Sequence, residues 1–436
     1  MLRTMDLRGQ TFSRSQLLAL VPRNETSSEK AVEQARVLVE DVKARGVQAL
    51  QQQAHDFDGV SNYDVRVPQF HLDDALAELP SEVRDALTVA IERVRLGSSA
   101  QVPATTETVI APGATITQRW QPVDRVGLYV PGGKAVYPSS VVMNVVAAQA
   151  AGVSSIALAS PPQSSHAGRV HPVILAAAKL LGVTEVYAMG GAGAIAGFAF
   201  GVPEIDLVPV NVVTGPGNVF VAAAKRLVRG VVGIDSEAGP TEILVIADDS
   251  ANPRFVAADL ISQAEHDELA SSVLVTDSED LAFRVASEVD SLASTTKHAP
   301  RVEVALSGQQ SAIVLVDSLS VAAEFSNAYA PEHLEIHTRD DETVLAEITN
   351  AGAIFLGSYT PVSLGDYSAG SNHVLPTAGQ AASSAALGAY TFLRPQQVVT
   401  YSKDALAQVH HGVVGLANSE DLPAHGEAIS IRFEES

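Results

Sequence analysis

The fold is decided by residues 125–218, in which apolar segments alternate with helical ones. The first apolar segment is Val126-Gly127-Leu128-Tyr129-Val130, and Pro131-Gly132-Gly133 leads from it into a helix expected from about residue 139. Three more apolar segments, at 155–159, 185–189 and 205–210, are each followed by a turn and a helical pattern. Four such units within about 100 residues predict a parallel, doubly wound α/β sheet.

A second alternating series starts at Glu242-Ile243-Leu244-Val245-Ile246-Ala247. The pattern predicts further strands at 272–275, near 302–307, near 312–317 and around Leu334 and Ile354. It also predicts helices at about 253–269, 278–292 and 320–328. The expected fold class is therefore α/β, with two Rossmann-like doubly wound lobes.

The rest of the chain divides around these lobes. Amphipathic helices are predicted at 29–53 and 72–95, and residues 101–122 are interpreted as a connection of strands and loops. We expect an N-terminal arm of residues 1–25, one lobe made of 26–108 and 238–380, a second lobe of 109–237, and a small helical C-terminal tail of 381–436. This tail is too short to bury a core of its own, so it should dock on the lobes or on a partner subunit.

The composition excludes several classes of partner. The 436 residues include 50 acidic and 28 basic ones, which gives a net charge of −22. This charge repels phosphodiester backbones and anionic lipids, so we expect neither a nucleic acid nor a membrane as partner. Cysteine is absent, which excludes thiolate ligands and thiol nucleophiles. The N-terminus lacks the pattern of a signal peptide, and no segment reaches the about 20 continuous apolar residues of a membrane span, so we expect a cytoplasmic protein.

An adjacent acid and imidazole, Glu332 and His333, are the first candidates for chemistry. The proline before them biases Ala330 away from the helical region, so the pair should lie where a helix gives way to a strand. Such a pair could move protons near neutral pH. Alternatively, the carboxylate is solvated or caps a helix and the histidine begins a buried strand. Asp366 follows the apolar run 353–356, and ligands of open α/β sheets lie outside the carboxyl ends of the strands, so both pieces could meet at one cleft.

Gln263 and His266 are candidates for metal binding. They are three residues apart on a predicted helix, so they should lie on one face, although such pairs are also frequent by chance. Asp366 and a histidine from elsewhere would complete a set of nitrogen and oxygen donors that suits zinc and leaves a position open to substrate. We interpret His373 as mainly structural.

Glycine-rich turns are candidates for a nucleotide site. Gly191-Ala192-Gly193-Ala194-Ile195-Ala196 meets the G-x-G-x-x-A pattern between a strand and a helix, although Asp206 follows it more closely than the usual ~20 residues. Tight turns also use glycine without any ligand, and Thr214-Gly215-Pro216-Gly217-Asn218 and Pro131-Gly132-Gly133 share this ambiguity. All three turns should lie at strand carboxyl ends of one lobe, and this shared edge favours a nucleotide cleft.

Taken together, these motifs resemble the histidinol dehydrogenase family over nearly the whole chain. The matching blocks, in chain order, are 126–133, 215–218, 238–242, 263–267, 330–335, 365–367 with 370–377, and the tail pair Glu420 and His425. The resemblance implies the last steps of histidine biosynthesis, in which L-histidinol is oxidised with NAD through L-histidinaldehyde to L-histidine. It also implies a zinc-dependent homodimer.

The resemblance further implies roles for individual residues. Glu332 and His333 would be the catalytic proton-transfer residues. The zinc ligands would be Gln263, His266, Asp366 and, from an exchanged tail of the other subunit, His425. Thr241, His333 and Glu420 would bind the substrate together with those four ligands. Tyr129, Gly193 and Asn218 would bind NAD.

The chain departs from the family pattern at two positions. Gly193 stands where a glutamine often contacts the nucleotide, so that contact must be missing or made by backbone. Thr241 stands where serine is common, which keeps the hydroxyl and adds a methyl group.

Three other functions are kept as alternatives. One is a zinc and NAD dehydrogenase of the same superfamily that acts on another small alcohol such as a sulfonated diol, although the carboxylate of Glu420 would repel a sulfonate. The others are a zinc hydrolase with Glu332 as base, and a ligand-binding module without catalysis.

Overall fold

The computed structural model describes residues 2–23, 29–132, 136–237 and 239–434. The chain forms two compact units, which are Met1–Gln101 with Val123–Phe392, and Val102–Pro122 with Leu393–Ser436. Gly133 and Ala238 of the motifs above lie outside the described residues. Among the described helices, none is both long enough and apolar enough to span a bilayer.

The first lobe of the larger unit is built on a five-stranded parallel sheet, in the order β6-β5-β4-β7-β8. Its strands are β4 Arg125–Tyr129, β5 Ser155–Ser160, β6 Glu185–Ala188, β7 Val212–Thr214 and β8 Gly233–Ile234. The helices between the strands are α6 Pro138–Ala151, α7 Pro172–Leu180, α8 Gly191–Phe200 and α9 Val219–Val228. This lobe confirms the predicted doubly wound fold.

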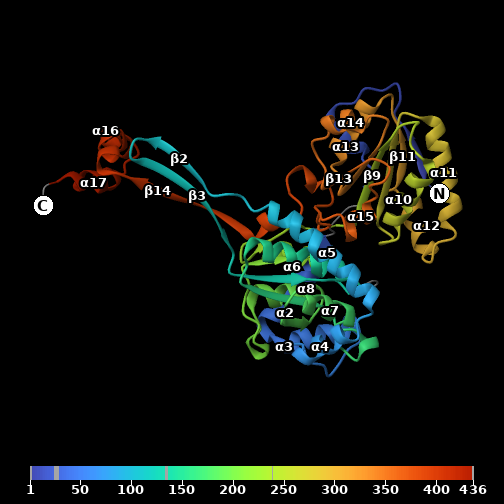
Figure 1. Ribbon diagram of the computed structural model, residues 1–436, viewed down its shortest axis with the longest axis horizontal. Helices are drawn as coiled ribbons and strands as arrows, with labels where there is room; N and C mark the ends of the chain where they lie inside the picture. Colours follow the sequence, from blue (N-terminus) through green and yellow to red (C-terminus); the bar gives the residue numbers. More distant parts are fainter. Residues whose placement is uncertain (1, 24–28, 133–135, 238, 435–436) are drawn as a thin grey trace. The chain divides into compact units, whose positions relative to one another are not determined.

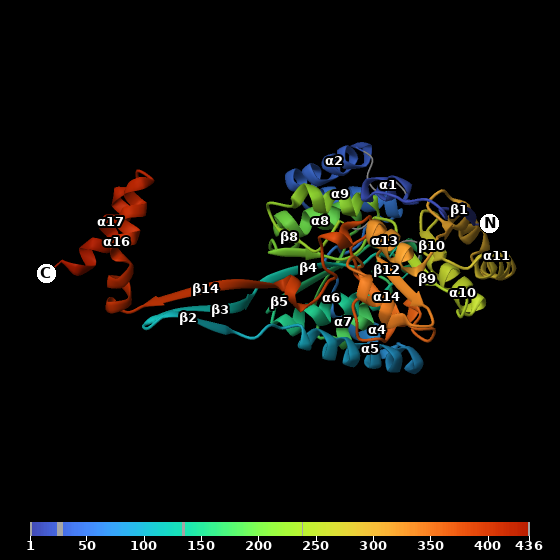
Figure 2. The ribbon, with the colours of Figure 1, turned by 90° about the horizontal axis from the view of Figure 1, so that it is seen from above.

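The N-terminal helices pack on this first lobe. They are α2 Glu29–Arg45, α3 Val47–Gln53, α4 Gln69–Ala77 and α5 Ser81–Ala100. Helix α2 packs on α8 and α9, α4 on α7 and α5 on α6, and Figure 2 shows α2 beside α8 and α9. We had assigned residues 26–108 to the other lobe. An amphipathic pattern specifies which face of a helix is buried but not which sheet covers it, so the sequence alone could not decide this.

The second lobe is built on a six-stranded parallel sheet, in the order β1-β11-β10-β9-β12-β13 (Figure 1). Its strands are β1 Arg3–Asp6, β9 Glu242–Ala247, β10 Ser271–Thr276, β11 Ala312–Leu315, β12 His333–His337 and β13 Ala353–Leu356. Helices α10 Pro253–Ala264, α11 Glu279–Ala293 and α12 Ala299–Ser307 share a core with one face. Helices α1 Arg14–Leu20, α13 Leu319–Tyr329 and α14 Asp341–Glu347 cover the other. Short helix α15 Val362–Tyr367 follows β13.

Two element predictions were wrong, and one strand was missed. Residues 302–307 belong to helix α12, because Pro300 starts a helix and the buried Val302 and Leu306 recur with helical spacing. The segment 205–210 is not a strand, and pairing begins only at β7, since Pro209 lacks the N–H that a central strand needs. The N-terminal arm contains an edge strand, β1, which pairs with β11.

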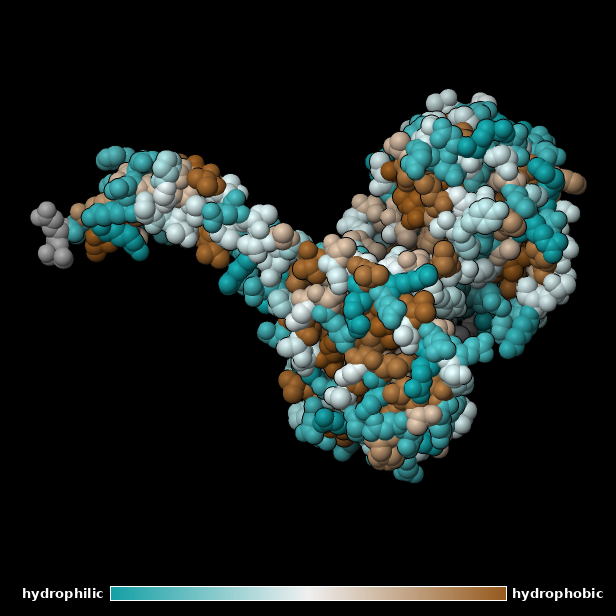
Figure 3. Space-filling model, viewed as in Figure 1, coloured by the Kyte–Doolittle hydropathy of each residue, from teal (hydrophilic) through white to brown (hydrophobic). Residues whose placement is uncertain are grey.

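The smaller unit combines two segments that are far apart in the sequence. The strands β2 Thr106–Ala111, β3 Ala114–Pro122 and β14 Leu393–Tyr401 form an antiparallel sheet in the order β14-β3-β2. Helices α16 Lys403–Ser419 and α17 Pro423–Ser430 follow β14. The unit therefore includes 102–122, whereas we expected a tail of 381–436 alone. It exposes large apolar side chains, some of which are visible in brown in Figure 3.

Candidate functional site

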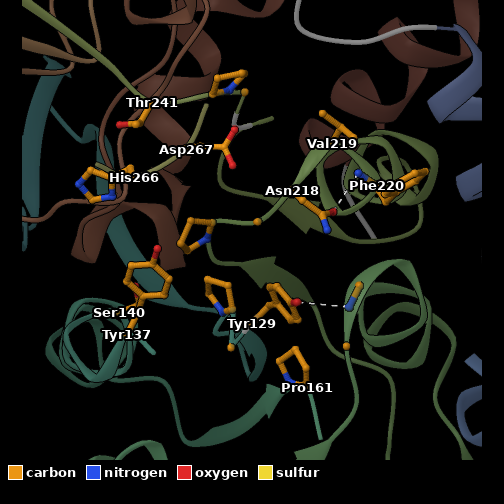
Figure 4. Close-up of a pocket in the computed structure, with 18 of the residues that line it drawn as sticks. Tyr129, Tyr137, Ser140, Pro161, Asn218, Val219, Phe220, Thr241, His266 and Asp267 are labelled. Carbon is orange, nitrogen blue, oxygen red and sulfur yellow. Dashed lines mark hydrogen bonds between the residues drawn. The ribbon is translucent and has the colours of Figure 1, made fainter. Parts of the chain in front are cut away.

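A cleft of about 1020 Å³ in the larger unit is lined by residues of both lobes. The first lobe contributes the turns that follow β4, β6 and β7, and the second contributes residues at the starts of β9 and β12 and at the end of α10. The cleft thus joins the carboxyl edge of one sheet to the amino edge of the other. In Figure 4, Thr241 and His266 lie on one side of it, and Asn218 and Phe220 on the other.

A hydrogen-bonded network of acid, imidazole and hydroxyl lies in this cleft. Glu332 Oε2 accepts from Thr241 Oγ1 at 2.6 Å and from the backbone N–H of Glu242 at 2.8 Å. His333 Nδ1 is 3.0 Å from the carbonyl oxygen of Glu242 and 3.4 Å from Glu332 Oε2. A carbonyl only accepts, so Nδ1 carries a proton and Nε2 is the basic nitrogen. Among the described residues, Nε2 is buried without a hydrogen-bond partner.

The sequence correctly predicted where Glu332 and His333 lie. Helix α13 ends at Tyr329 and β12 begins at His333. Ala330, between them, leaves the helix in the left-handed conformation, with φ 48° and ψ 65°. The chain therefore turns sharply enough for Glu332 to reach back to the start of β9.

The two groups shift each other's pKa in opposite directions. Burial alone would lower the pKa of His333, but the adjacent Glu332 carboxylate outweighs it and raises the pKa to about 9. Burial alone would raise the pKa of Glu332, but the charge of His333 and the hydrogen bonds from Thr241 and Glu242 lower it below its usual range. The pair is therefore an ion pair at neutral pH, and Nε2 can accept a proton only in those molecules whose imidazole is neutral, a fraction that grows as the pH approaches 9.

Three of the four predicted zinc ligands belong to the larger unit. Gln263, near the end of α10, is buried and donates from Nε2 to Thr241 Oγ1. His266 lines the cleft, but α10 ends at Ala264, so it lies in the turn after the helix rather than on a helix face as predicted. A hydrogen bond from its N–H to the carbonyl of Gln263, at 3.2 Å, keeps the two residues within one turn.

Asp366 also lines the cleft, at an edge of the sheet that we did not predict. It lies on α15, which begins where Val362 N–H bonds Glu335 and carries the chain back from the carboxyl edge. Asp366 therefore faces the same amino edge as His333 instead of the carboxyl edge of β13. The returning helix, which the apolar run did not reveal, accounts for the difference.

His373 is a cleft residue whose position the sequence did not reveal. Its Nδ1 is 3.0 Å from the carbonyl oxygen of Asp366 and its Nε2 is 3.1 Å from Ser140 Oγ on α6 of the first lobe. Burial lowers its pKa, which agrees with a neutral ring that donates from Nδ1 and accepts at Nε2. His373 therefore connects the two lobes beside Asp366.

Two of the three predicted NAD contacts line the cleft. Tyr129 at the end of β4 is buried, and its hydroxyl accepts from Gly191 N–H at 3.2 Å, which leaves its own proton to donate. Asn218 caps α9, and its Oδ1 accepts from the N–H groups of Phe220 and Val221. Only its amide nitrogen therefore remains to donate to a ligand.

Gly193 is not among the cleft-lining residues. It lies in the first turn of α8 against α3, where a Cβ would collide with Gln53 Oε1. Gln53 itself lines the cleft. Asp206, the acid nearest the glycine pattern, also points elsewhere, because it pairs with Arg66 at 2.9 Å and its side chain is 84% exposed.

The tail candidates lie in the smaller unit. Glu420 ends α16, His425 lies on α17, and both side chains are exposed.

A second polar cluster lies on the same face of β12 as His333. Asp259 on α10 and Glu335 and His337 on β12 have ligand-type atoms within 4.8 Å of one another. In the part of the chain that the structure describes, Glu335 Oε2 and both ring nitrogens of His337 are buried without hydrogen-bond partners, although His337 Nε2 lies 3.5 Å from Glu335 Oε2. This cluster does not line the cleft and shares no residue with the predicted zinc set.

The fold and the cleft define an α/β protein that holds an acid–imidazole pair between two doubly wound lobes. The family model for histidinol dehydrogenase matches residues 21–433. The chain is 62% identical to the histidinol dehydrogenase of Leifsonia xyli subsp. xyli over the full length of both proteins, and 57% identical to that of Thermobifida fusca over 98% of this chain and 97% of that protein. The crystal structure of histidinol dehydrogenase from Elizabethkingia anophelis superposes with a TM-score of 0.92 at 32% identity and covers 99% of this chain and 98% of that one.

The chain belongs to the histidinol dehydrogenase family. This membership confirms the prediction of an oxidoreductase that acts in histidine biosynthesis with NAD and zinc. It does not favour the alternative of a dehydrogenase for another alcohol.

Proposed function

We propose that the cleft oxidises the alcohol carbon of L-histidinol twice, and that Glu332 and His333 move the protons. The observation that carries this assignment is the orientation of His333. Its Nδ1 lies against Glu242 and Glu332. Its Nε2 belongs to a side chain that lines the cleft, is buried, and has no hydrogen-bond partner within the described parts of the chain. A base oriented in this way is directed at a substrate rather than at the protein.

The donors in and beside the cleft suit zinc. Gln263 does not line the cleft, but its amide nitrogen is bonded to Thr241, which does, so the amide oxygen is left as the donor. His266 and Asp366, which line the cleft, add an imidazole nitrogen and a carboxylate oxygen. Such neutral and anionic N/O donors are those that zinc accepts. Bound there, zinc would hold the amine and imidazole of histidinol and fix the alcohol carbon.

In the first oxidation, His333 Nε2 takes the proton of the substrate hydroxyl. NAD, when bound, would accept the hydride of the carbon in this oxidation, and a second NAD would accept the hydride of the next one. The chain has no cysteine, so no thiol adduct can form with the aldehyde and the second oxidation passes through its hydrate. Glu332 orients the water for this addition, and His333 again takes a proton. Thr241 holds Glu332 in place and lies beside the substrate.

The proposal includes a homodimer in which His425 and Glu420 reach the active site of the other subunit. Both side chains are exposed, and the unit that carries them exposes Val109, Val399 and Leu416, which a partner would cover. A carboxylate at position 420 also suits the cationic amine of histidinol.

An intersubunit complementation experiment tests this arrangement. The variants His333→Asn and His425→Ala should each be inactive alone. In mixed dimers, one of the two sites would combine an intact lobe with an intact tail, so random mixing should restore about a quarter of the activity. A mixture that stays inactive although dimers exchange would show that His425 acts within its own subunit.

The activity itself is tested by counting NADH. Two NADH should form per histidinol, and chelation of zinc should abolish both, with recovery when zinc is returned. A single NADH, or turnover that survives verified metal removal, would contradict the proposal. We also propose a cytoplasmic location, which cell fractionation with activity assays would test.

A further inference from the structure

The cleft contains a carboxylate that the proposed reaction does not use. Asp58 is the last residue of the π-helical turn η1 Ala54–Asp58, which continues directly from α3. It lines the cleft from the first lobe, whereas the catalytic pair lies on the second. In the described part of the chain, the carboxylate of Asp58 makes neither a hydrogen bond nor an ion pair.

Asp58 is not an ordinary solvated surface acid. Burial raises its pKa to about 6, so the carboxylate is partly withdrawn from water. Among the described residues that line the cleft, none is lysine or arginine, so no cationic side chain compensates it there. An unpaired and partly desolvated carboxylate of this kind suits a ligand that donates hydrogen bonds.

One neighbour of Asp58, Tyr129, is a predicted NAD contact. Burial raises the pKa of Tyr63 and of Tyr129, and the charge of Asp58 adds to the rise in both, so these rings lie near it. Tyr129 is bonded to Gly191 at the start of α8. The N-terminus of a helix with a glycine turn is where a pyrophosphate binds. Asp58 is thus close to the turn that would hold the centre of a dinucleotide.

The side of the cleft that contains Asp58 also offers an aromatic ring on which an adenine base could stack. Phe57 is 68% exposed and lines the cleft, so its ring is available to stack on a base. Gln53 is buried, donates to the carbonyl of Leu38 at 3.1 Å and occupies the space that a side chain at Gly193 would need. The acid that ordinarily follows the glycine pattern, Asp206, is bound to Arg66 outside the cleft. Among the described residues of the first lobe, Asp58 is therefore the one carboxylate that lines the cleft.

We propose that Asp58 binds the 2′- and 3′-hydroxyls of the adenosine ribose of NAD and thereby selects NAD over NADP. The two carboxylate oxygens accept the two vicinal hydroxyls, as an acidic residue does in other dinucleotide sites. A 2′-phosphate would instead bring negative charge against this carboxylate, with no described cationic side chain in the cleft to balance it. This inference deepens the proposed function and rests on NAD binding at the glycine turns.

The test compares Asp58→Asn with the matched control Asp56→Asn. Asp56 lies in the same turn, bonds Gln52 at 2.9 Å and does not line the cleft. Asp58→Asn should weaken NAD binding about tenfold or more, since a hydrogen bond to a charged group contributes on that scale. The preference for NAD over NADP in kcat/KM should fall by a similar factor, while the KM for histidinol changes less than about twofold. Asp56→Asn should behave as wild type.

A modified cofactor provides a second readout that uses the wild-type enzyme. NAD that lacks the 2′-hydroxyl of the adenosine ribose should bind wild type about tenfold more weakly than NAD. Asp58→Asn should bind the two cofactors almost equally. If wild type does not distinguish them, or if Asp58→Asn keeps full discrimination against NADP, the inference is wrong even though histidinol is oxidised. Failure of the proposed function would look different, because wild type would then form no NADH at all.

Discussion

Strand β12 and the residue just before it contain two acid–imidazole pairs, and their surroundings shift the pKa values of the two pairs in opposite directions. In the pair Glu332 and His333, the carboxylate accepts two hydrogen bonds, its pKa is lowered and the pKa of the imidazole is raised. In the pair Glu335 and His337, burial and the nearby carboxylate of Asp259 raise the pKa of Glu335, while burial lowers the pKa of His337.

The difference comes from the donors that each carboxylate receives. Glu332 is held by a hydroxyl and a backbone N–H and stands directly beside the imidazole, so ionisation of both groups is favoured. Glu335 receives one N–H, from Val362, and faces another carboxylate, while His337 Nε2 is 3.5 Å away from it. Similar burial and the same residue types thus favour the charged forms of the pair at the cleft and disfavour the charged forms in the cluster away from it.

The largest effect should separate the two histidines. His333→Asn should lower kcat about 10²–10⁴-fold, because it removes the proton acceptor of both oxidations. His337→Asn, on the same face of the same strand, should change kcat less than about threefold because it does not line the cleft. Steady-state NADH formation from both purified variants makes the comparison. Equal losses of kcat in the two variants would mean that the cluster of Asp259, Glu335 and His337 takes part in the reaction.

The second-largest effect should be a difference between the two oxidation rates of a Glu332 variant. Glu332→Gln keeps the size of the side chain but cannot accept a proton, so it should retain part of the first oxidation and lose about a hundredfold in the second, where water must be activated. Rates measured with histidinol and with histidinaldehyde as separate substrates give the two numbers. A matching loss in both steps would refute this division of roles.

The pH profile should show the raised pKa of His333. Below about pH 9 the imidazole is protonated and cannot accept a proton, so kcat/KM should fall by about tenfold per pH unit as the pH decreases. In Glu332→Gln this limb should move to lower pH, because the carboxylate that raises the pKa is gone. A limb that stays in place would show that another group titrates.

The smallest effect should be on stability. A carboxyl whose pKa is raised in the folded state stabilises the protein at low pH, and this contribution is lost as the pH rises through the raised pKa. Because glutamine does not ionise, Glu335→Gln avoids the loss of stability that wild type undergoes as Glu335 ionises. The variant should therefore have a Tm about 2 °C or more above that of wild type at pH 8, a similar Tm at pH 5, and a nearly unchanged kcat. Thermal unfolding at both pH values tests this. A lower Tm at pH 8 would show that the ionised form of Glu335 is needed for stability.

The sequence predicted the two lobes because parallel strands that are buried on both faces read as apolar runs such as 243–247. Strand β1 was missed, since Arg3–Asp6 is an edge strand whose residues are mostly exposed and polar. The position of Glu332 and His333 between a helix and a strand could be predicted, because a proline disfavours the helical conformation of the residue before it.

The contacts of that pair did not follow from local rules. The hydrogen bond between Thr241 and Glu332 joins residues 91 apart and depends on the pairing of β12 with β9. The contact between Ser140 and His373 spans 233 residues and two lobes. Strand register and the packing of lobes are properties of the whole chain, and short motifs do not contain them.

The antiparallel ladder of the smaller unit has a practical consequence. Strand β3 pairs along its whole length with β14, which lies some 270 residues later in the chain. A stop codon before Leu393 would therefore not simply shorten the protein. It would leave the β2–β3 hairpin behind with an open row of N–H and C=O groups on β3, an edge that recruits other chains. Fragments ending there should be recovered as aggregates, and a clean removal of this unit requires excision of the hairpin as well as the last 44 residues, 393–436.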